Sequence, residues 1–438
     1  MNDRARLAAS GDVPDDLRAA RRRRMWRIAV GLFLLSALIE IVARQWAGYI
    51  DLQVYRNGAR VWLDGHDLYG PLPPSGGLGL PFTYPPPAAL FFIPLALMPL
   101  WLAGPATVLV SLICLGLTLW VVLNALDSTP DRTTRWALVI GGVGLLGLSE
   151  PVRQTYNFGQ VNLVLMTAIV LDVLVRRPGW PRGMLIGIAI AVKLTPAGFL
   201  LYFLVRRDWR AMLTTVLSAL ATIAIGVALF PRESAEYWSR VIRDTGRIGP
   251  PAFAGNQSLK GMVFRLGLGE QAATRLWLTL AVVAVALAAV VMWRLVQTPQ
   301  PIGPEQARPT GPEQARPTGL EQATALLVNA LAVLLVSPVS WSHHWVWVAP
   351  AVPVALAWLR RAGFTRARLA VAAAIALIFL IGPHWLLPHS AHREHGWALW
   401  QQAIGSSYVL LTFAGLAVAA VCFRRGYRGA RNAASAAA

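Results

Sequence analysis

Long apolar runs, separated by polar turns and a few longer polar loops, fill the chain from about residue 27 to residue 424. A helix needs about 20 apolar residues to cross a bilayer, so these runs predict an all-α, polytopic membrane protein with about 12 transmembrane helices. The predicted segments centre near residues 35, 95, 115, 142, 168, 194, 220, 285, 330, 352, 377 and 414. In an alternative with about 10 crossings, the segment around Lys193-Leu194-Thr195-Pro196 is re-entrant.

Composition supports the membrane interpretation and excludes a soluble globular enzyme and a disordered chain. Hydrophobic residues make up 56% of the chain and charged residues 14%, whereas soluble domains carry about 25% charged residues. The net charge of +19 would suggest nucleic-acid binding in a soluble protein. Here it marks the cytoplasmic ends of helices and contacts with anionic lipid, so membrane lipid is expected as a partner and nucleic acid is not. Cys114 and Cys422 lie in apolar runs and are too few for a disulfide framework or a zinc site.

Arginine clusters set the expected orientation. Arg21–Arg24 precede the first apolar run and place the N-terminus in the cytoplasm by the positive-inside rule. The twelve-crossing arrangement also puts the clusters at 206–210, 360–368 and 424–431 in the cytoplasm, but it puts the cluster at 176–182 outside. The ten-crossing alternative removes that conflict.

Both arrangements place four loops on the non-cytoplasmic face, at 44–87, 231–272, 338–344 and 383–403. All 7 histidines lie in these loops: His66, His343, His344, His384, His389, His392 and His395. We therefore expect the chemistry of the protein on this face.

Asp51 follows the first membrane helix by a few residues, and the preceding Trp46 and Tyr49 suit the aromatic belt of the membrane interface. A carboxylate there can act as a general base toward a lipid-linked substrate, or it can simply cap an interfacial helix. Lys193 lies in an apolar run before Pro196. An ionisable residue inside the membrane is a candidate functional residue, which could pair with a phosphate or extend its side chain to the interface.

Several other polar or aromatic residues are candidates for binding substrate. Amides can bond sugar hydroxyls, aromatic rings can stack on sugars, and arginine binds phosphate in a bidentate manner. With Lys193, the candidate substrate-binding residues are Tyr55, Tyr84, Gln160, Asn162, Arg243, Arg247, Asn256, Gln257, Lys260 and Trp341. Side chains of the adjacent His343 and His344 diverge on a helix, which argues against a metal pair. No cofactor is expected, and the sequence leaves open whether Asp51 binds a divalent cation. No Walker-type nucleotide motif is present.

Polar segments divide the chain into five predicted regions. In order, they are a cytoplasmic Arg-rich leader (1–26), a catalytic transmembrane module with the loops 44–87 and 231–272 (27–296), a low-complexity cytoplasmic linker (297–322), C-terminal transmembrane helices (323–424) and a cytoplasmic tail (425–438). The linker contains an octapeptide repeat, Gly303–Thr310 followed by Gly311–Thr318. Such a segment cannot bury a core and is given no catalytic role.

Motifs along nearly the whole chain resemble those of the actinobacterial polyprenol-phosphate-mannose-dependent α-mannosyltransferases of the PimE type, which have the GT-C membrane fold. In order, the matching motifs are Asp51-Leu52-x-Val54-Tyr55-x-x-Gly58-Ala59, Leu68-Tyr69, Pro81-Phe82-Thr83-Tyr84-Pro85-Pro86, Gly159-Gln160-x-Asn162, Lys193-Leu194-Thr195-Pro196, Asn256-Gln257-Ser258 and Ser337-Pro338-x-Ser340-Trp341-x-His343-His344. Any one of these motifs is weak, and together they are fairly specific.

The resemblance implies an inverting transfer of mannose from polyprenyl-phosphate-mannose to a glycolipid acceptor, with an α-1,2 linkage. Acceptors in the family include phosphatidylinositol mannosides and the core of lipomannan or lipoarabinomannan. Asp51 matches the catalytic acid/base aspartate of the family, and the pair His343 and His344 matches its active-site histidine motif. The resemblance also implies a plasma-membrane enzyme with an extracytoplasmic active site. Two alternatives stay open: transfer of another polyprenyl-phosphate sugar such as arabinose, and transport of a lipid-linked sugar.

Overall fold

The computed structural model describes residues 15–127, 131–297 and 318–436. Residues 1–14 of the expected leader and residues 298–317 of the expected linker lie outside the described residues. The described residues form helices joined by turns and loops, and they contain no β-strand, only two isolated bridges at Ser75↔Leu78 and Asn256↔Trp341. The all-helical class predicted from the sequence is therefore confirmed for this part of the chain.

The helices follow the apolar runs closely. The longer ones are α2 (Asp15–Val42), α3 (Ile50–Leu63), α4 (Pro86–Leu97), α5 (Leu100–Ala125), α6 (Arg132–Gly147), α8 (Asn162–Leu174), α11 (Trp209–Leu229), α14 (Glu270–Gln297), α15 (Gly319–Val336), α16 (Val348–Ala362), α17 (Arg366–Ile381) and α19 (Ser407–Ala436). The short α-helices are α7 (Glu150–Phe158), α9 (Met184–Val192), α10 (Leu200–Arg206), α12 (Pro231–Ser239), α13 (Leu259–Phe264) and α18 (Leu399–Gly405). The 3-10 helices are η1 (Thr195–Phe199), η2 (Val241–Arg243), η3 (Thr245–Ile248), η5 (Ser342–Trp347), η6 (Pro383–Leu386) and η7 (Arg393–Gly396).

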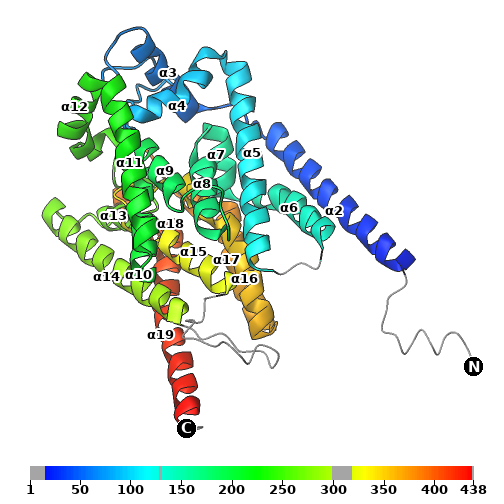
Figure 1. The fold of residues 1–438 in the computed structure, drawn as a ribbon. Helices are drawn as coiled ribbons and strands as arrows, with labels where there is room; N and C mark the ends of the chain where they lie inside the picture. The colour runs from blue at the N-terminus through cyan, green and yellow to red at the C-terminus, as the bar shows by residue number, and fades with distance from the viewer. Residues whose placement is uncertain (1–14, 128–130, 298–317, 437–438) are drawn as a thin grey trace, which may run out of the picture.

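In the described part of the chain, five helices are long and apolar enough to cross a membrane, or up to seven if each of two bent pairs counts as one span. Eleven of the predicted segment centres fall inside a helix, and the one near residue 194 falls at the break between α9 and η1. The multi-pass character is thus confirmed, whereas a count of twelve crossings is not. The run near residue 95 is the 12-residue helix α4, which Figure 1 shows with α3 at the upper end of the bundle.

The chain reverses direction at Lys193. The start of α9 lies against the start of α11, because a Cβ on Gly183 would be 2.2 Å from the carbonyl oxygen of Ala211. From there α9 leads to Lys193, and η1 with α10 leads back to Arg206, three residues before α11 begins. The arginines at 176–182 and 206–210 therefore lie at the same end of the bundle. This geometry matches the re-entrant alternative and differs from the twelve-crossing expectation, which separates the two clusters.

Small residues allow the long helices to approach one another closely. A Cβ on Gly144 of α6 would be 2.6 Å from the Cα of Phe33 in α2. A Cβ on Gly187 of α9 would be 2.5 Å from the carbonyl oxygen of Thr215 in α11. Hydrophobic association adds little between helices in lipid, so such close van der Waals contact is one of the main forces that stabilise a membrane bundle.

Helix α3 is fixed by arginines that bond the last turn of α4. Arg56 donates hydrogen bonds to the carbonyl oxygens of Leu95 (2.9 Å) and Met98 (2.5 Å), and Arg60 donates to that of Ala96 (2.8 Å). Carbonyls at a helix C-terminus lack intrahelical partners and favour a positive charge. These bonds hold α3, whose first turn carries Asp51, in a single orientation against the bundle.

Candidate active site

Asp51 lies in the first turn of α3, at the edge of a buried polar cluster. Tyr49 precedes the helix in a left-handed conformation (φ 49°), and its N–H donates to the carbonyl oxygen of Asn157 at 2.6 Å. The Nε2 of Gln160 donates to Oδ2 of Asp51 at 2.7 Å. Burial raises the pKa of Asp51 to about 6, and the Gln160 hydrogen bond and the charge of Lys193 partly oppose this rise. A carboxylate with this pKa is a stronger base than an exposed one and is still mostly ionised at neutral pH.

Gln160 is held from both sides of its amide. Its Oε1 accepts a hydrogen bond from the hydroxyl of Tyr55 at 2.6 Å, which directs its Nε2 toward Asp51. The hydroxyl of Tyr84 lies 2.9 Å from that of Tyr55 and donates to it, because the Tyr55 proton is already used. Gly159 has φ 67°, and a Cβ there would be 2.7 Å from Cβ of Leu52. The close approach of the 159–162 turn to α3 therefore needs glycine.

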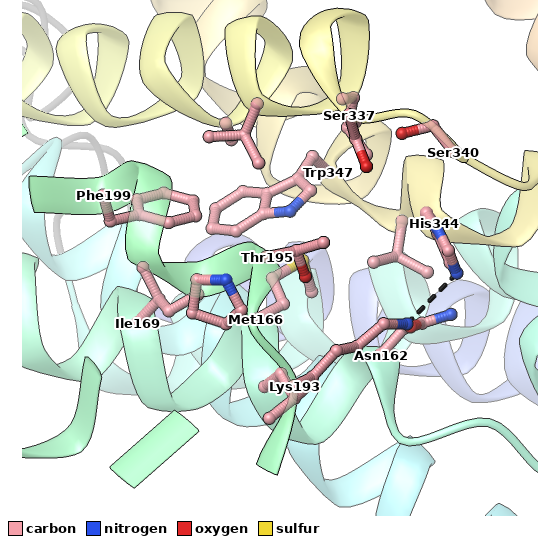
Figure 2. Close-up of a pocket in the computed structure, with 16 residues that line it drawn as sticks. Asn162, Met166, Ile169, Lys193, Thr195, Phe199, Ser337, Ser340, His344 and Trp347 are labelled. Carbon is pink, nitrogen blue, oxygen red and sulfur yellow. Dashed lines mark hydrogen bonds between the residues drawn. The ribbon is translucent and has the colours of Figure 1, made fainter. Parts of the chain in front are cut away.

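Lys193 forms the second part of the cluster (Figure 2). Its Nζ lies 3.1 Å from Nε2 of His344 and 3.3 Å from Oδ1 of Asn162, and it lies 5.7 Å from the ring centre of Tyr84. Burial lowers the pKa of Lys193 to about 8, while the negative charge of Asp51 opposes that shift. Lys193 thus keeps its positive charge at neutral pH, and since an ammonium group only donates, Nε2 of His344 accepts.

Both histidines of the 337–344 motif enter this cluster on η5. The carbonyl oxygen of His343 accepts hydrogen bonds from Oγ1 of Thr155 (3.1 Å) and Nδ2 of Asn162 (2.9 Å). Nε2 of His343 is buried without a hydrogen-bond partner. Burial and the nearby charge of Lys193 hold the pKa of both histidines well below the usual value. Neutral imidazoles at this place can bond a sugar hydroxyl or a phosphate oxygen but add no charge.

Glu150 supports the histidine segment and was not among the residues singled out from the sequence. Its Oε1 accepts from Oγ of Ser342 (2.6 Å) and Nε1 of Trp385 (2.7 Å), and its Oε2 accepts from the hydroxyl of Tyr408 (2.9 Å). Glu150 is fully buried, and His384 lies 3.8 Å from it. The sequence carries the same signal here as at Lys193, since Glu150 is an ionisable residue between two apolar runs.

The three other cationic candidates make their contacts elsewhere. Arg243 is exposed on η2. Arg247 donates from Nη2 to the carbonyl oxygen of Tyr69 at 2.9 Å, and its Nε is buried without a partner. Nζ of Lys260 lies over the rings of Phe264 and Trp277, 5.3 Å and 5.0 Å from their centres. Their predicted role toward phosphate stays a prediction.

Asn256, Gln257 and Trp341 join the loops that carry the histidine segment. Asn256 donates to the carbonyl oxygens of Pro251 and Pro338 and accepts from the N–H of Ser340. Gln257 donates to the carbonyl oxygens of Ala254 and Gly405. The ring of Trp341 lies edge-on to Phe253, with 5.9 Å between their centres. The contacts of both amides are those of residues that position a loop, and substrate binding by these three residues is untested.

A pocket next to Lys193 leads away from the polar cluster. Figure 2 shows its polar end at Asn162, Lys193 and His344 and its apolar walls at Met166, Ile169, Phe199 and Trp347. Its volume is about 50 Å³, which holds a few water molecules and is too small for a lipid headgroup. In the described residues, no three His, Cys, Asp or Glu side chains form a group that could hold a metal ion.

Comparison with known proteins shows that the chain is similar to membrane-lipid mannosyltransferases. Residues 82–304 match the model of a family described as glycosyltransferase family 87. The chain is 39% identical to a polyprenol-phosphate-mannose-dependent alpha-(1-2)-phosphatidylinositol mannoside mannosyltransferase of Mycolicibacterium smegmatis, across 90% of this chain and 89% of that protein. A protein of the same description from Mycobacterium tuberculosis is 37% identical across 91% of each chain. No solved structure matches the chain.

A further relative has a more specific name. It is a polyprenol-phosphate-mannose-dependent alpha-(1-2)-phosphatidylinositol pentamannoside mannosyltransferase of Mycobacterium tuberculosis. The chain is 31% identical to it across 77% of this chain and 76% of that protein. The similarity thus extends over most of the chain for relatives that differ in their named acceptor.

Proposed function

This chain is a membrane enzyme of glycosyltransferase family 87, and we propose that it transfers mannose from polyprenyl-phosphate-mannose to a phosphatidylinositol mannoside. The names of its relatives support this donor and this acceptor class. We further propose an inverting mechanism, an α-(1→2) linkage, the GT-C fold, and a location in the plasma membrane with the active site on the extracytoplasmic face. The reversal of the chain at Lys193 supports the topology with about 10 crossings.

The arrangement of Asp51 and Lys193 is the observation that carries the mechanism. The two side chains belong to one cluster, in which Gln160 bonds Asp51 and Tyr55, Tyr55 bonds Tyr84, and Lys193 lies over the Tyr84 ring. A base and a cation therefore belong to one cluster, in which the charge of each acts on the other. An inverting transferase needs this pair, a base for the attacking hydroxyl and a cation for the leaving phosphate.

In the proposed step, one C–O bond forms as another breaks. A hydroxyl oxygen of the acceptor attacks C1 of the donor mannose from the side opposite the phosphate, and its proton passes to the carboxylate of Asp51. The bond between C1 and the phosphate oxygen breaks, and its electron pair leaves with polyprenyl phosphate. Lys193 offsets the charge that develops on that oxygen, while the neutral His344 and the amide of Asn162 direct the Lys193 ammonium group.

The test is transfer of labelled mannose by purified protein. We expect label from polyprenyl-phosphate-[14C]mannose to appear in the glycolipid product, and Asp51→Asn to lower kcat by a factor of about 10² to 10⁴ through loss of the base. Asp64→Asn is the matched control, because Asp64 is exposed at the other end of the same helix. Movement of labelled lipid from one leaflet of a vesicle membrane to the other, without formation of a new glycosidic bond, would instead support a transporter. Full turnover by folded Asp51→Asn protein would overturn the base assignment.

A further inference from the structure

A second, larger cavity lies between the end of α2 and the first half of α5. It has a volume of about 400 Å³ and is lined by Ile41, Arg44, Trp46, Tyr49, Val108 and Leu112, among others. This volume falls in the range of about 300–1,000 Å³ that is typical of ligand sites, unlike the small pocket at Lys193. Its walls are apolar except for Arg44. We refer to it as the α2–α5 groove.

The surroundings of the α2–α5 groove are those of a lipid-binding site. Its walls come from the end of α2, from the segment that joins α2 to α3, and from α5. The two helices are both apolar and long enough to span a membrane, with spans at Ala19–Val42 and Leu100–Ala125. Figure 1 shows these helices close together near the end of α2 and diverging toward its beginning, where α6 lies between them. A groove between two membrane spans opens to hydrocarbon, so an acyl or isoprenoid chain is the chemistry that fits it. Arg44 comes two residues after the span ends, at the depth of lipid phosphate.

The α2–α5 groove also ends against the candidate active site. The ring of Tyr49 forms part of its wall and packs on α5 at Gly104, where a Cβ would be 2.3 Å from the ring. Tyr49 directly precedes α3, and Asp51 is two residues further on. A lipid in the groove with its phosphate at Arg44 therefore has its headgroup next to the helix that carries the base.

We propose that the α2–α5 groove binds an acyl chain of the acceptor, an anionic glycerophospholipid that carries sugars, and that Arg44 pairs with its phosphodiester. This inference rests on the proposed mannosyl transfer, and it assigns the two lipids of that reaction to separate places. The donor phosphate is bonded to the reacting carbon, so it must lie at the reaction centre, where Lys193 is. The acceptor phosphate is separated from the reacting hydroxyl by the sugars of the headgroup, so it belongs at a cation outside the centre.

Photocrosslinking of the wild-type protein tests the occupant directly and does not depend on turnover. Three probes with a diazirine in the apolar chain are compared: a phosphatidylinositol mannoside, phosphatidylglycerol and a polyprenyl phosphate. We expect the mannoside probe to label residues 41–49 and 105–112, and unlabelled mannoside but not polyprenyl phosphate to compete. Equal, uncompeted labelling by phosphatidylglycerol would show a bulk-lipid site, and labelling by the polyprenyl probe would show the donor chain. Either result would overturn the assignment while leaving mannosyl transfer intact.

Kinetics with a matched pair of variants provides a second test. Leu109 lines the groove and Val110 does not, although the two are adjacent and both exposed on α5. We expect Leu109→Trp to raise the KM for a diacyl acceptor by about tenfold, because loss of contact with two or three methylene groups is sufficient for that change. The KM for a water-soluble mannoside without acyl chains should not change, and Val110→Trp should leave both constants as they are. An equal effect of Leu109→Trp on both acceptors would contradict the proposal.

Discussion

Two side chains of the candidate site, Asp51 and Lys193, should determine how the activity depends on pH. The base must be deprotonated, so kcat/KM should rise with pH through about 6, the pKa of Asp51. The cation must be protonated, so kcat/KM should fall as the pH exceeds about 8, the pKa of Lys193. A bell-shaped profile between pH 5 and 9 is the expected result. Lys193→Arg should lose the alkaline limb because arginine stays charged; retention of that limb would assign it to another group.

Gln160 provides a finer test of the base. Its hydrogen bond to the Asp51 carboxylate favours the ionised form and so lowers the pKa of Asp51. Gln160→Leu should therefore raise that pKa and move the acid limb of the profile to higher pH, with the alkaline limb unchanged. Gln154→Leu, a change of the same kind on α7, is the control. An acid limb that stays in place in the Gln160 variant would show that a group other than Asp51 sets this limb of the kcat/KM profile.

At the residue scale, the sequence is informative where a polar group stands in an apolar context. Asp51 and Lys193 could be found because charged residues in or next to membrane segments cost free energy and commonly mark functional sites. Glu150 gives the same signal, but its partner Ser342 is 192 positions away, and no spacing rule joins the two. Conversely, Arg243 and Lys260 are conspicuous in the sequence because basic residues stand out on that face, whereas their side chains lie on the surface or over aromatic rings.

Among the helices, α7 sets the geometry of the site along its whole length. Glu150 at its start holds Ser342, Thr155 in its middle holds the carbonyl of His343, and Asn157 near its end holds the N–H of Tyr49. Gln160 follows in the next turn and bonds Asp51. The helix therefore joins the segment that carries the base to the segment that carries the histidines.

The role of α7 predicts a loss of turnover from a residue that touches no substrate. Glu150→Gln places an N–H donor opposite hydroxyl donors, and it should lower the free energy of unfolding by about 1–3 kcal/mol. It should also lower kcat by about tenfold, a barrier increase of roughly 1.4 kcal/mol, with little change in KM.

Three further variants separate positioning by Glu150 from loss of stability alone. Glu150→Asp, which keeps the carboxylate, should restore part of kcat, and Ser342→Ala should reproduce the loss. Glu321→Gln breaks an ion pair between the buried Glu321 and the exposed Arg361 and serves as the control for stability. A Glu150→Gln variant that melts earlier but keeps its kcat would reduce Glu150 to a structural role.

Hydrophobic patterning finds the helices better than it finds their course through the membrane. Window hydropathy locates the apolar runs, because burial in lipid demands them whatever the packing. It does not distinguish a crossing from a re-entrant segment, since η1 and α10 are apolar in either case and their direction is set by packing against α11 and α15. The bend of 119° between α7 and α8 likewise follows from the glycine turn at 159 and from contacts with α3, which are tertiary features.

On the scale of the whole molecule, the proposed roles place the two lipid phosphates at different cations around one reaction centre. Lys193, the cation proposed for the donor phosphate, lies where η1, α8 and η5 meet, whereas the α2–α5 groove with Arg44 lies on the side of Tyr49. Asp51 and its partner Gln160 stand between them. An enzyme whose substrates are both lipids needs such a division, because two chains entering from the same opening would compete for it.

The sidedness of the bundle can be decided with single cysteines. In a protein with Cys114→Ala and Cys422→Ser, a cysteine at the exposed position 64 should react with a membrane-impermeant maleimide in intact cells, whereas one at the exposed position 210 should react only after permeabilisation. The re-entrant course at Lys193 places Arg177 at the end of the bundle where Arg210 lies, so Arg177→Cys should behave like Arg210→Cys. Labelling of Arg177→Cys in intact cells, in variants that still transfer mannose, would restore the twelve-crossing arrangement. It would also place the turn at 153–162 opposite Asp51, which is incompatible with the hydrogen bond between Gln160 and Asp51.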